Sequence, residues 1–363
     1  ALVPIYPTLT DDQVAHIVSD SGARIAVVSD ARQLAKMLPL AGGGQPLERI
    51  VVVEPAGAPD DAPVMALADL EARGAHRVAE APDLVDRLAA DVGPDDLATL
   101  IYTSGTTGKQ KGVMLTHRNF ISNIDATFDR TKILSSDDVA LSYLPLSHIF
   151  ERTAIYGFLH TGVAIYYSSG FDRVAEEFKE VRPTVATSVP RLFEKMYAKI
   201  CDAGAAGGGI KTMLFRRALR CGDRRARASH AGDTVSPLVQ LEYDLLADRL
   251  LFRKWRDALG GRVRYFISGG APLAPDIAYA FLGAGIPIFE GYGLTETSPV
   301  IAVNHPAAYR IGTVGRPLPN VALWSANSTP SLINSPSLIR RPSLINSPSL
   351  ISSPSLMSKP CAT

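Results

Sequence analysis

Hydrophobic and polar positions along the chain form a repeating pattern of short apolar runs and amphipathic stretches. The first amphipathic stretch begins at Thr10, which forms a capping box with Gln13, and it stops at Gly22. Strands that alternate with helices are typical of a parallel sheet whose faces are covered. Up to residue 94 the pattern predicts a helix at 10–22, a buried strand at 24–28, a helix at 30–38, a buried strand at 50–53, a helix at 64–73 and a connector at 79–94.

The alternation resumes after residue 95 and continues to about residue 300. Pro190 stands at the first position of a predicted helix, where its missing N–H costs no hydrogen bond. The predicted strands lie at 97–102, 113–115, 139–144, 163–167, 184–188, 263–267 and 286–289. The predicted helices lie at 116–128, 152–160, 174–180, 190–200, 210–236, 237–259 and 275–283.

The last segment, from residue 324, does not continue this pattern. From Pro330 it repeats every six residues, reading PSLINS, PSLIRR, PSLINS, PSLISS and PSLMSK. Prolines this frequent oppose a helix or a central strand, so the segment is predicted to be disordered and of low complexity. A left-handed β-helix also uses hexapeptides but would need its own stacked core and caps. A frame error or an aberrant gene end would also produce such a repeat.

Composition limits the classes of function. The chain has 363 residues, enough for two or more packed units, and its 46% hydrophobic and 20% charged content fits a globular protein. A net charge of +1 gives no general attraction to nucleic acid. No apolar run is long enough to span a bilayer. The three cysteines lack metal-ligand spacing, which favours reduced thiols in a cytoplasmic setting.

The stretch with the clearest chemistry is residues 103–112, between the extended segments 97–102 and 113–115. Hydroxyls and glycines place O–H and backbone N–H donors around an anion without steric hindrance, and Lys111 adds positive charge. A Walker A loop cannot be fitted to these residues, and an ordinary hairpin turn is a weaker explanation for so many donors. We therefore predict a loop that holds a polyphosphate through Thr103, Ser104, Gly105, Thr106, Thr107, Gly108 and Lys109.

Residues 103–112 resemble the signature of the adenylate-forming superfamily, which includes acyl-CoA synthetases, adenylation domains and luciferases. The family usually has Lys-Pro-Lys where this chain has Lys109-Gln110-Lys111. Since Pro fixes φ, the departure removes some stiffness from the loop but no charge and no donor.

A second stretch, residues 291–297, follows a predicted buried strand and reads GYGLTET. Open α/β sheets bind ligands at such strand ends. Thr295 offers a hydroxyl to a phosphate, and the Glu296 carboxylate is a hard oxygen ligand suited to Mg²⁺. The alternative is a strand-end turn with a solvated Glu. The stretch resembles the superfamily's Tyr-Gly-x-Thr-Glu motif, which implies cofactor-binding roles for Gly291, Tyr292 and Gly293.

Two more stretches resemble the same superfamily. Residues 268–272 are similar to the wall on the adenine side, which implies binding roles for Gly269, Gly270 and Ala271; a Gly-rich turn is the alternative. Residues 147–151 are similar to the aromatic and histidine motif near the acyl carboxylate, which implies a role for His148, although a lone histidine is usually structural. The histidines without such a context are expected to be surface residues, for example His16, His76 and His230.

Three stretches in combination look like long-chain fatty acyl-CoA synthetases: LPLSHIFER at 144–152, VPRLFEK at 189–195 and GYGLTETSPV at 291–300. The resemblance implies an α/β fold of two parallel-rich sheets with covering helices, in subdomains 1–135 and 136–323. It implies ATP-dependent activation of a long-chain fatty acid through acyl-AMP to acyl-CoA, with ATP, Mg²⁺ and coenzyme A. It assigns catalytic roles to Lys111, His148, Thr295 and Glu296.

Two other functions stay open at this point. One is another acid-activating enzyme, such as a fatty acyl-AMP ligase without a CoA step. The other is a non-catalytic nucleotide-binding remnant. The resemblance runs from Ala1 to about Leu323, and the family's ribose-binding Asp and C-terminal domain with its Lys are not found after it. We therefore expect a fragment that also lacks preceding residues.

The predicted helix at 210–236 is unusually basic. Its lysine and arginines, at residues 211–227, are interleaved with Met213, Leu214, Phe215 and Leu219. A basic amphipathic helix can lie on an anionic membrane surface, which would be a peripheral contact. The other interpretation, a solvated helical face, is favoured by the sequence alone.

Overall fold

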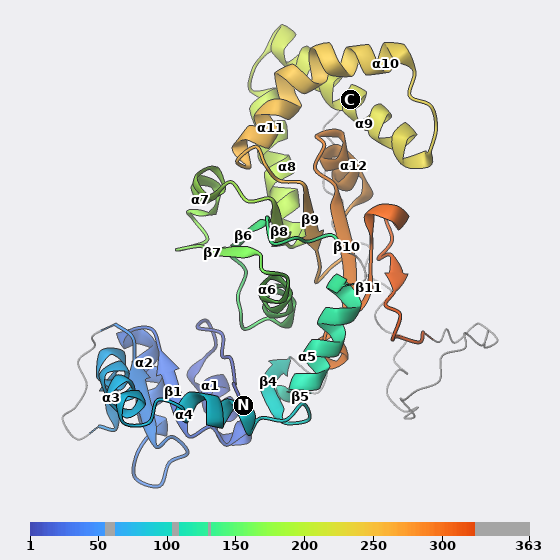
Figure 1. Ribbon diagram of the computed structural model, residues 1–363. Helices are drawn as coiled ribbons and strands as arrows, with labels where there is room; N and C mark the ends of the chain where they lie inside the picture. The colour runs from blue at the N-terminus through green and yellow to red at the C-terminus, as the bar shows by residue number, and fades with distance from the viewer. Residues whose placement is uncertain (55–61, 104–108, 130–131, 324–363) are drawn as a thin grey trace.

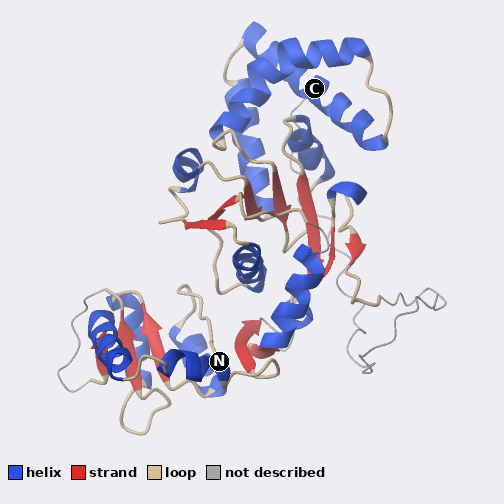
Figure 2. Ribbon diagram, viewed as in Figure 1, coloured by secondary structure: helices blue, strands red, loops and turns tan. Residues whose placement is uncertain are grey.

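The computed structural model describes residues 1–54, 62–103, 109–129 and 132–323, which form three sheets with helices packed against them (Figures 1 and 2). The predicted repeat at 324–363 and loop residues 104–108 lie outside these described residues. Two of the three sheets are parallel or mainly parallel, which confirms the predicted α/β class.

The N-terminal unit contains a three-stranded parallel sheet in the order β1 (Ile25–Val28), β2 (Arg49–Val52), β3 (Val64–Ala66). Helices α1 (Asp11–Ser21) and α2 (Ala31–Met37) pack on one face of it. The capping box at Thr10 and the left-handed Gly22 that ends α1 are both present, as predicted.

Residues 24–28 are predicted to form a buried strand. The strand is present, but only one of its two faces is buried. Ala26 and Val28 are buried against α1 and α2, but Ile25 and Val27 are exposed in the described part of the chain. The helices α1 and α2 cover the face that holds Ala26 and Val28, and the opposite row of β1 side chains faces solvent in the described part of the chain.

The prediction of a helix at 64–73 and of a connector at 79–94 also needs correction. Residues 64–66 form β3, which pairs with β2, and α3 (Leu67–Glu80) follows directly. A further short helix, α4 (Leu84–Ala90), occupies the predicted connector. A strand of three residues is too short for a periodic signal, and its hydrogen bonds come from a distant strand.

The predicted phosphate loop joins two antiparallel strands, β4 (Leu97–Thr103) and β5 (Lys111–Thr116). Helix α5 (His117–Ile124) follows, with Thr116 and Asn119 forming its capping box, and continues as a π-helical turn, Asp125–Asp129. Figure 1 shows β4, β5 and α5 between the N-terminal unit and the large sheet.

The large sheet has seven strands in the order β12-β11-β10-β9-β8-β6-β7. The five strands from β7 to β10 are parallel, whereas β11 and β12 are antiparallel to their neighbours. Their bounds are β6 Val139–Ser142, β7 Ala164–Tyr167, β8 Val185–Ser188, β9 Tyr265–Ser268, β10 Ile288–Gly293, β11 Val300–Val303 and β12 Arg316–Pro317.

Helices cover both faces of this sheet. α5 and α6 pack with the cluster that contains Ala140, Val185 and Ile267, while α7, α8, α9, α11 and α12 pack with the cluster around Phe266. The bounds are α6 Ile149–Thr161, α7 Val174–Val181, α8 Pro190–Ala205, α9 Gly209–Ala231, α10 Pro237–Glu242, a π-helical segment Tyr243–Phe252, α11 Arg253–Ala258 and α12 Pro275–Gly283.

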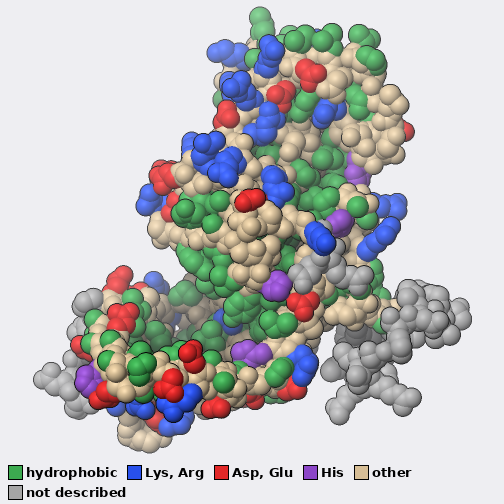
Figure 3. Space-filling view, viewed as in Figure 1, with side chains coloured by type: hydrophobic (Ala, Val, Ile, Leu, Met, Phe, Trp, Pro, Cys, Tyr) green, Lys and Arg blue, Asp and Glu red, His purple; other side chains and the backbone are tan. Residues whose placement is uncertain are grey.

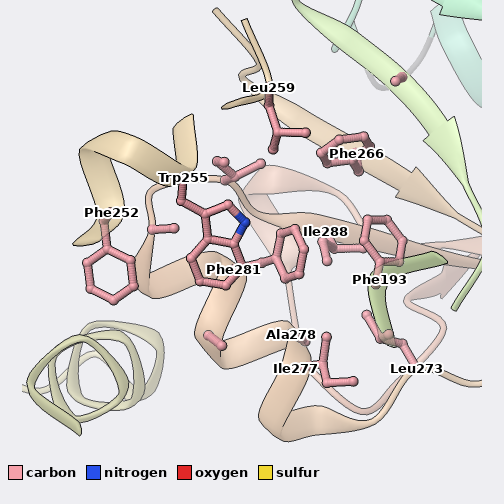
Figure 4. Close-up of a cluster of buried hydrophobic side chains, with 14 of the residues drawn as sticks. Phe193, Phe252, Trp255, Leu259, Phe266, Leu273, Ile277, Ala278, Phe281 and Ile288 are labelled. Atoms are coloured by element: carbon pink, nitrogen blue, oxygen red, sulfur yellow. The ribbon is translucent and has the colours of Figure 1, made fainter. Parts of the chain in front are cut away.

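Aromatic side chains form the centre of the second cluster (Figure 4). Phe193 of α8 packs edge-on against Phe266 of β9 and Phe281 of α12, with ring centroids 5.3 and 5.2 Å apart. Trp255 of α11 contacts the same Phe281 at 4.8 Å. These contacts fix the sheet to its helices, which gives the strand ends beside them a rigid base.

The division into subdomains at residue 135 stays a prediction. The hydrophobic cluster that contains Ala140 joins side chains from both sides of that position. Ile101 and Phe120 pack in it together with Ile149 and Phe158. None of the helices in the described ranges is both long enough and apolar enough to cross a membrane.

Candidate functional site

Three of the predicted motifs meet at one cavity of about 340 Å³. Thr103 from the end of β4, His148 from the start of α6 and Thr295 from the turn after β10 all line it. The other lining residues are Pro4, Tyr6, Leu9, Ile17, Ile101, Tyr102, Gln110 and Ile149. Residues separated by almost 200 positions in sequence therefore share one site.

The motifs at 268–272 and 291–297 lie side by side at the carboxyl ends of parallel strands. β9 and β10 pair in a register that places Ser268 beside Glu290, so residues 269–271 and 291–293 follow at neighbouring strand ends. On the other side of β9, Ser188 of β8 pairs with the same Ser268. This is the edge of an open α/β sheet at which ligands bind.

The two strands beside the predicted phosphate loop bring a hydroxyl and a lysine together. Thr103 pairs with Lys111 across the hairpin, and Tyr102 pairs with Gly112. A Cβ on Gly112 would lie only 3.1 Å from the Tyr102 ring, so this close approach favours glycine. Lys109 and Lys111 are both exposed, and neither makes an ion pair within the described residues.

Helix α1 is hydrogen-bonded to residues on both sides of the predicted loop, Tyr102 before it and Gln110 at its end. His16 Nε2 lies 2.9 Å from the Gln110 carbonyl oxygen, so a proton on Nε2 is donated to it. Tyr102 donates its hydroxyl to Asp20 at 2.7 Å, and burial raises the Tyr102 pKa. The expectation that His16 is merely a surface residue is therefore wrong. The contact joins residues 94 positions apart, so no local pattern indicated it.

His230 is also more than a surface residue. Its Nε2 accepts a hydrogen bond from the Ile311 backbone N–H at 3.1 Å, and its ring packs edge-on against Tyr279 and Tyr309. It lies on α9 and supports the chain after β11, outside the candidate site. His76 is exposed on α3, as expected.

His148 caps the N-terminus of α6. Its Nδ1 accepts the Phe150 backbone N–H at 3.2 Å, so in the neutral ring the proton is on Nε2. The imidazole is accessible where it lines the cavity, but the surrounding chain desolvates part of the ring and lowers its pKa. A neutral imidazole with an available N–H is thus presented to the cavity.

Two buried ionisable residues fix α6 behind His148. Glu151 accepts the Ser142 hydroxyl at 2.6 Å and the Thr187 hydroxyl at 2.5 Å, which ties the helix to β6 and β8. Burial outweighs these two hydrogen bonds and raises the Glu151 pKa to about 7. Arg152 donates to the Thr99 hydroxyl on β4 at 2.9 Å, and its buried position lowers its pKa.

The turn after β10 is organised by Thr297. Its hydroxyl accepts the Leu294 N–H at 2.9 Å and donates to the Pro299 carbonyl. The adjacent Thr295 faces the cavity, and Glu296 is exposed. A Cβ on Gly293 would lie 2.1 Å from the Pro299 oxygen, so internal packing already requires a glycine there.

The two glycines after β9 have different roles in the backbone. A Cβ on Gly269 would lie 3.1 Å from the Phe150 ring, so this glycine accommodates an aromatic side chain of α6. Gly270 has a φ of 87° and open space at its Cβ position, which leaves its backbone accessible. Tyr292 on the neighbouring strand is also exposed.

Three buried hydroxyls lie at this edge; no role was predicted for Tyr143 and Ser188, whereas Ser268 begins the predicted stretch 268–272. Tyr143, Ser188 and Ser268 follow or end β6, β8 and β9, and their oxygens have no hydrogen-bond partner within the described chain. Ser188 and Ser268 are fully buried. The pairing of β8 with β9 places Ser188 beside Ser268, which the sequence alone does not indicate.

Among the described residues of the four motifs, Glu296 supplies the exposed carboxylate. Among the described residues there is no cluster of three or more His, Cys, Asp or Glu side chains that could hold an ion. Mg²⁺ is commonly held by one or two carboxylates together with substrate phosphates. The exposed Glu296, beside the phosphate-loop strands, fits a site of that kind.

Comparison with known proteins agrees with this geometry. The sequence matches the AMP-binding enzyme family over residues 1–324. It is 36% identical over 325 residues to the peroxisomal long chain acyl-CoA synthetase 6 of Arabidopsis thaliana, covering 87% of this chain and 44% of that protein. It is 35% identical over 333 residues to the long-chain-fatty-acid–CoA ligase FadD15 of Mycobacterium bovis, covering 91% and 53%.

Solved structures share the fold. A long-chain-fatty-acid–CoA ligase, FadD1 of Archaeoglobus fulgidus, superposes with a TM-score of 0.56 at 20% identity, over 87% of this chain and 52% of that one. The N-terminal domain of FACL13 from Mycobacterium tuberculosis gives 0.52 at 20% identity, over 87% and 62%. The chain spans about half the length of the curated relatives it matches. It belongs to the family of AMP-binding enzymes.

Proposed function

We propose that this chain is part of an enzyme that activates a long-chain fatty acid with ATP and transfers the acyl group to coenzyme A. The observation that carries the proposal is the cavity lined by Thr103, His148 and Thr295, one residue from each of three motifs. The names of the relatives, which are long-chain acyl-CoA synthetases and CoA ligases, favour this substrate class and the CoA step.

The proposed reaction has two steps. The fatty acid carboxylate attacks the α-phosphorus of ATP, giving acyl-AMP and pyrophosphate. The thiolate of CoA then attacks the acyl carbonyl and releases AMP. Neither step needs a nucleophile from the protein, so catalysis rests on positioning and on stabilising negative charge.

Each motif receives one role in this proposal. Residues 103–108, with Lys109 and Lys111, bind the β- and γ-phosphates, and Thr295 binds the α-phosphate. Glu296 would hold Mg²⁺, which neutralises phosphate charge when bound. Tyr292 and residues 269–271 border the adenine, and His148 lies near the acyl carboxylate. Support comes from the exposure of both lysines and of Glu296, and from the open space at Gly270.

The cellular setting is part of the proposal. Three cysteines without ligand spacing support a reducing, cytoplasmic location. Contact of residues 211–227 with a membrane surface would bring the enzyme to a long-chain acid, and the structure of that region is considered below.

Two measurements test the proposed reaction. Binding of ATP and Mg²⁺ to this chain is measured by calorimetry, and palmitate-dependent exchange between ATP and pyrophosphate is measured with the protein expressed from its complete gene. We expect exchange that requires palmitate, and palmitoyl-CoA only when CoA is added. Exchange with palmitate but no acyl-CoA would indicate an acyl-AMP ligase, and no exchange with any fatty acid would contradict the proposal.

A further inference from the structure

Three leucines form an exposed apolar stripe on the helix that begins at Pro237. Leu238, Leu241 and Leu245 are 78%, 55% and 56% exposed. Their spacing of three and four residues places them on one face, away from Tyr243 and Ala247, which are buried. Sequence reasoning predicted a long helix at 237–259 but gave this face no role.

Helix α9, which packs against this helix, has exposed apolar side chains of its own and adds positive charge. Ile210 and Met213, in its first turns, are also exposed. Residues 209–258 carry eleven Lys and Arg against six Asp and Glu, although the whole chain has a net charge of +1. Residues 209–258 form a helical lobe. Figure 3 shows hydrophobic side chains along the outer edge of this lobe, with Lys and Arg side chains beside them.

The two helices are held together by ion pairs, a cation–π contact and a shared buried cluster. Glu242 accepts Arg217 at 2.6 Å and Arg224 at 3.4 Å. The Arg225 guanidinium lies 4.2 Å from the centre of the Tyr243 ring. Beneath these contacts Cys221 and Tyr243 belong to one buried cluster. The leucine stripe is therefore displayed on a packed scaffold.

Other basic residues of the lobe are exposed and are not neutralised by a neighbouring carboxylate of the described chain. Arg216 and Arg220 on α9, and Arg249 on the π-helical segment, are exposed and make no ion pair with any residue that the structure describes. A solvated helical face, the interpretation that the sequence alone favoured, explains the arginines. It does not explain three large leucines facing water on the adjoining helix.

We propose that α9 and the helix starting at α10 dock on an anionic lipid bilayer, with Leu238, Leu241 and Leu245 inserted at the headgroup level. The arginines contact lipid phosphates beside the inserted leucines. Helices that lie in a membrane interface combine an apolar face with Lys and Arg in this way, and anionic lipids attract each basic residue. An acidic protein partner would match the arginines but not the leucines.

Co-sedimentation with vesicles tests this surface. The full chain is mixed with vesicles of phosphatidylcholine alone, or of phosphatidylcholine with about 30 mol% phosphatidylglycerol, at two salt concentrations. We expect binding to the anionic vesicles that weakens with salt. Replacing all three leucines (Leu238→Ser, Leu241→Ser, Leu245→Ser) should reduce the partition coefficient by roughly tenfold or more.

Two further variants make the test specific. Arg216→Glu with Arg220→Glu should reduce binding and flatten its salt dependence, since fewer cations meet the lipid phosphates. Val85→Ser with Leu88→Ser removes two equally exposed apolar side chains from α4, and it should bind as the unmodified chain does. Circular dichroism checks that each variant is folded.

Several results would overturn the proposal. These are no binding to anionic vesicles, equal binding by the triple-leucine variant, or an equal loss in the α4 variant. If sedimentation equilibrium shows a dimer that the leucine substitutions dissociate while vesicle binding is unchanged, the surface is a self-association face instead. No substrate is needed in these measurements, so their failure would leave the proposed reaction untouched.

Discussion

Asn123 on α5 exchanges two hydrogen bonds with the backbone of Val300 on β11. Its Nδ2 donates to the Val300 carbonyl at 2.9 Å, and its Oδ1 accepts the Val300 N–H at 3.2 Å. α5 follows β5, the strand after the predicted phosphate loop, and Val300 ends the stretch that contains Thr295 and Glu296. One buried amide therefore links the element after the predicted phosphate loop to the stretch that is proposed to bind the α-phosphate and Mg²⁺.

Replacing this amide should cost stability and disturb the site. In Asn123→Ala the Val300 N–H and carbonyl lose their partners, so we expect the free energy of unfolding to fall by about 1–3 kcal/mol. Asn320→Ala is the control, because Asn320 makes only a long, exposed hydrogen bond to the Ser122 carbonyl. Urea denaturation compares the two variants, and equal stabilities would argue against the proposed link.

Lys111 offers the second prediction. It is exposed opposite Thr103 and is proposed to meet phosphate oxygens. Removing one preorganised charge donor commonly lowers a rate by about 10²–10³-fold, so Lys111→Ala should reduce palmitate-dependent ATP–pyrophosphate exchange by roughly 10²-fold or more. Lys179→Ala, an exposed lysine on α7, should exchange at the normal rate. Unchanged exchange in Lys111→Ala would remove the role assigned to it.

Glu296 is the proposed metal ligand, and its substitution has a distinct effect. Glu296→Gln keeps the size of the side chain but removes the charge that suits Mg²⁺. We expect the variant to need a higher Mg²⁺ concentration for half-maximal exchange and to turn over more slowly, with unchanged thermal stability because the side chain is exposed. Glu71→Gln on α3 serves as the control. Superimposable Mg²⁺ titrations of the unmodified protein and Glu296→Gln would contradict the assignment.

Much of the fold could be predicted because its signals are local. The capping box at Thr10, Pro at the start of α8 and α12, and the apolar runs of β6, β8 and β9 lie within a few residues of the elements they define. The motifs could be placed at strand ends for the same reason. A short apolar run followed by small residues indicates where a strand stops and a loop begins.

The parts of the fold and of the candidate site that could not be predicted depend on contacts between separate parts of the chain. β3 exists because Val64–Ala66 pairs with β2, and which row of β1 side chains is buried depends on the helices that pack on the small sheet. Asn123 and Val300 are 177 positions apart, and the hydrogen bond from His16 to Gln110 spans 94. No periodicity or motif reports such pairs, so these supports of the site required the structure.

Glu151 gives a prediction about pH. Its carboxyl is buried between Ser142 and Thr187, and burial raises its pKa from 4.5 to about 7. The folded state therefore retains a proton that the unfolded state has already lost at neutral pH. Stability from this group is fully present below about pH 4.5 and is lost as the pH rises through about 7. The shift corresponds to about 3 kcal/mol, since each pKa unit is worth about 1.4 kcal/mol.

The neutral variant Glu151→Gln should lose this dependence. Its free energy of unfolding should fall less than that of the unmodified chain between about pH 5 and about pH 8. His148, whose pKa is lowered, contributes with the opposite sign, but it is present in both proteins and cancels in the difference. Glu177→Gln is the control, because the Ser168 and Ser169 hydrogen bonds hold that pKa at about 2, outside this range. Parallel stability curves for the unmodified chain and Glu151→Gln would show that Glu151 does not titrate between these pH values.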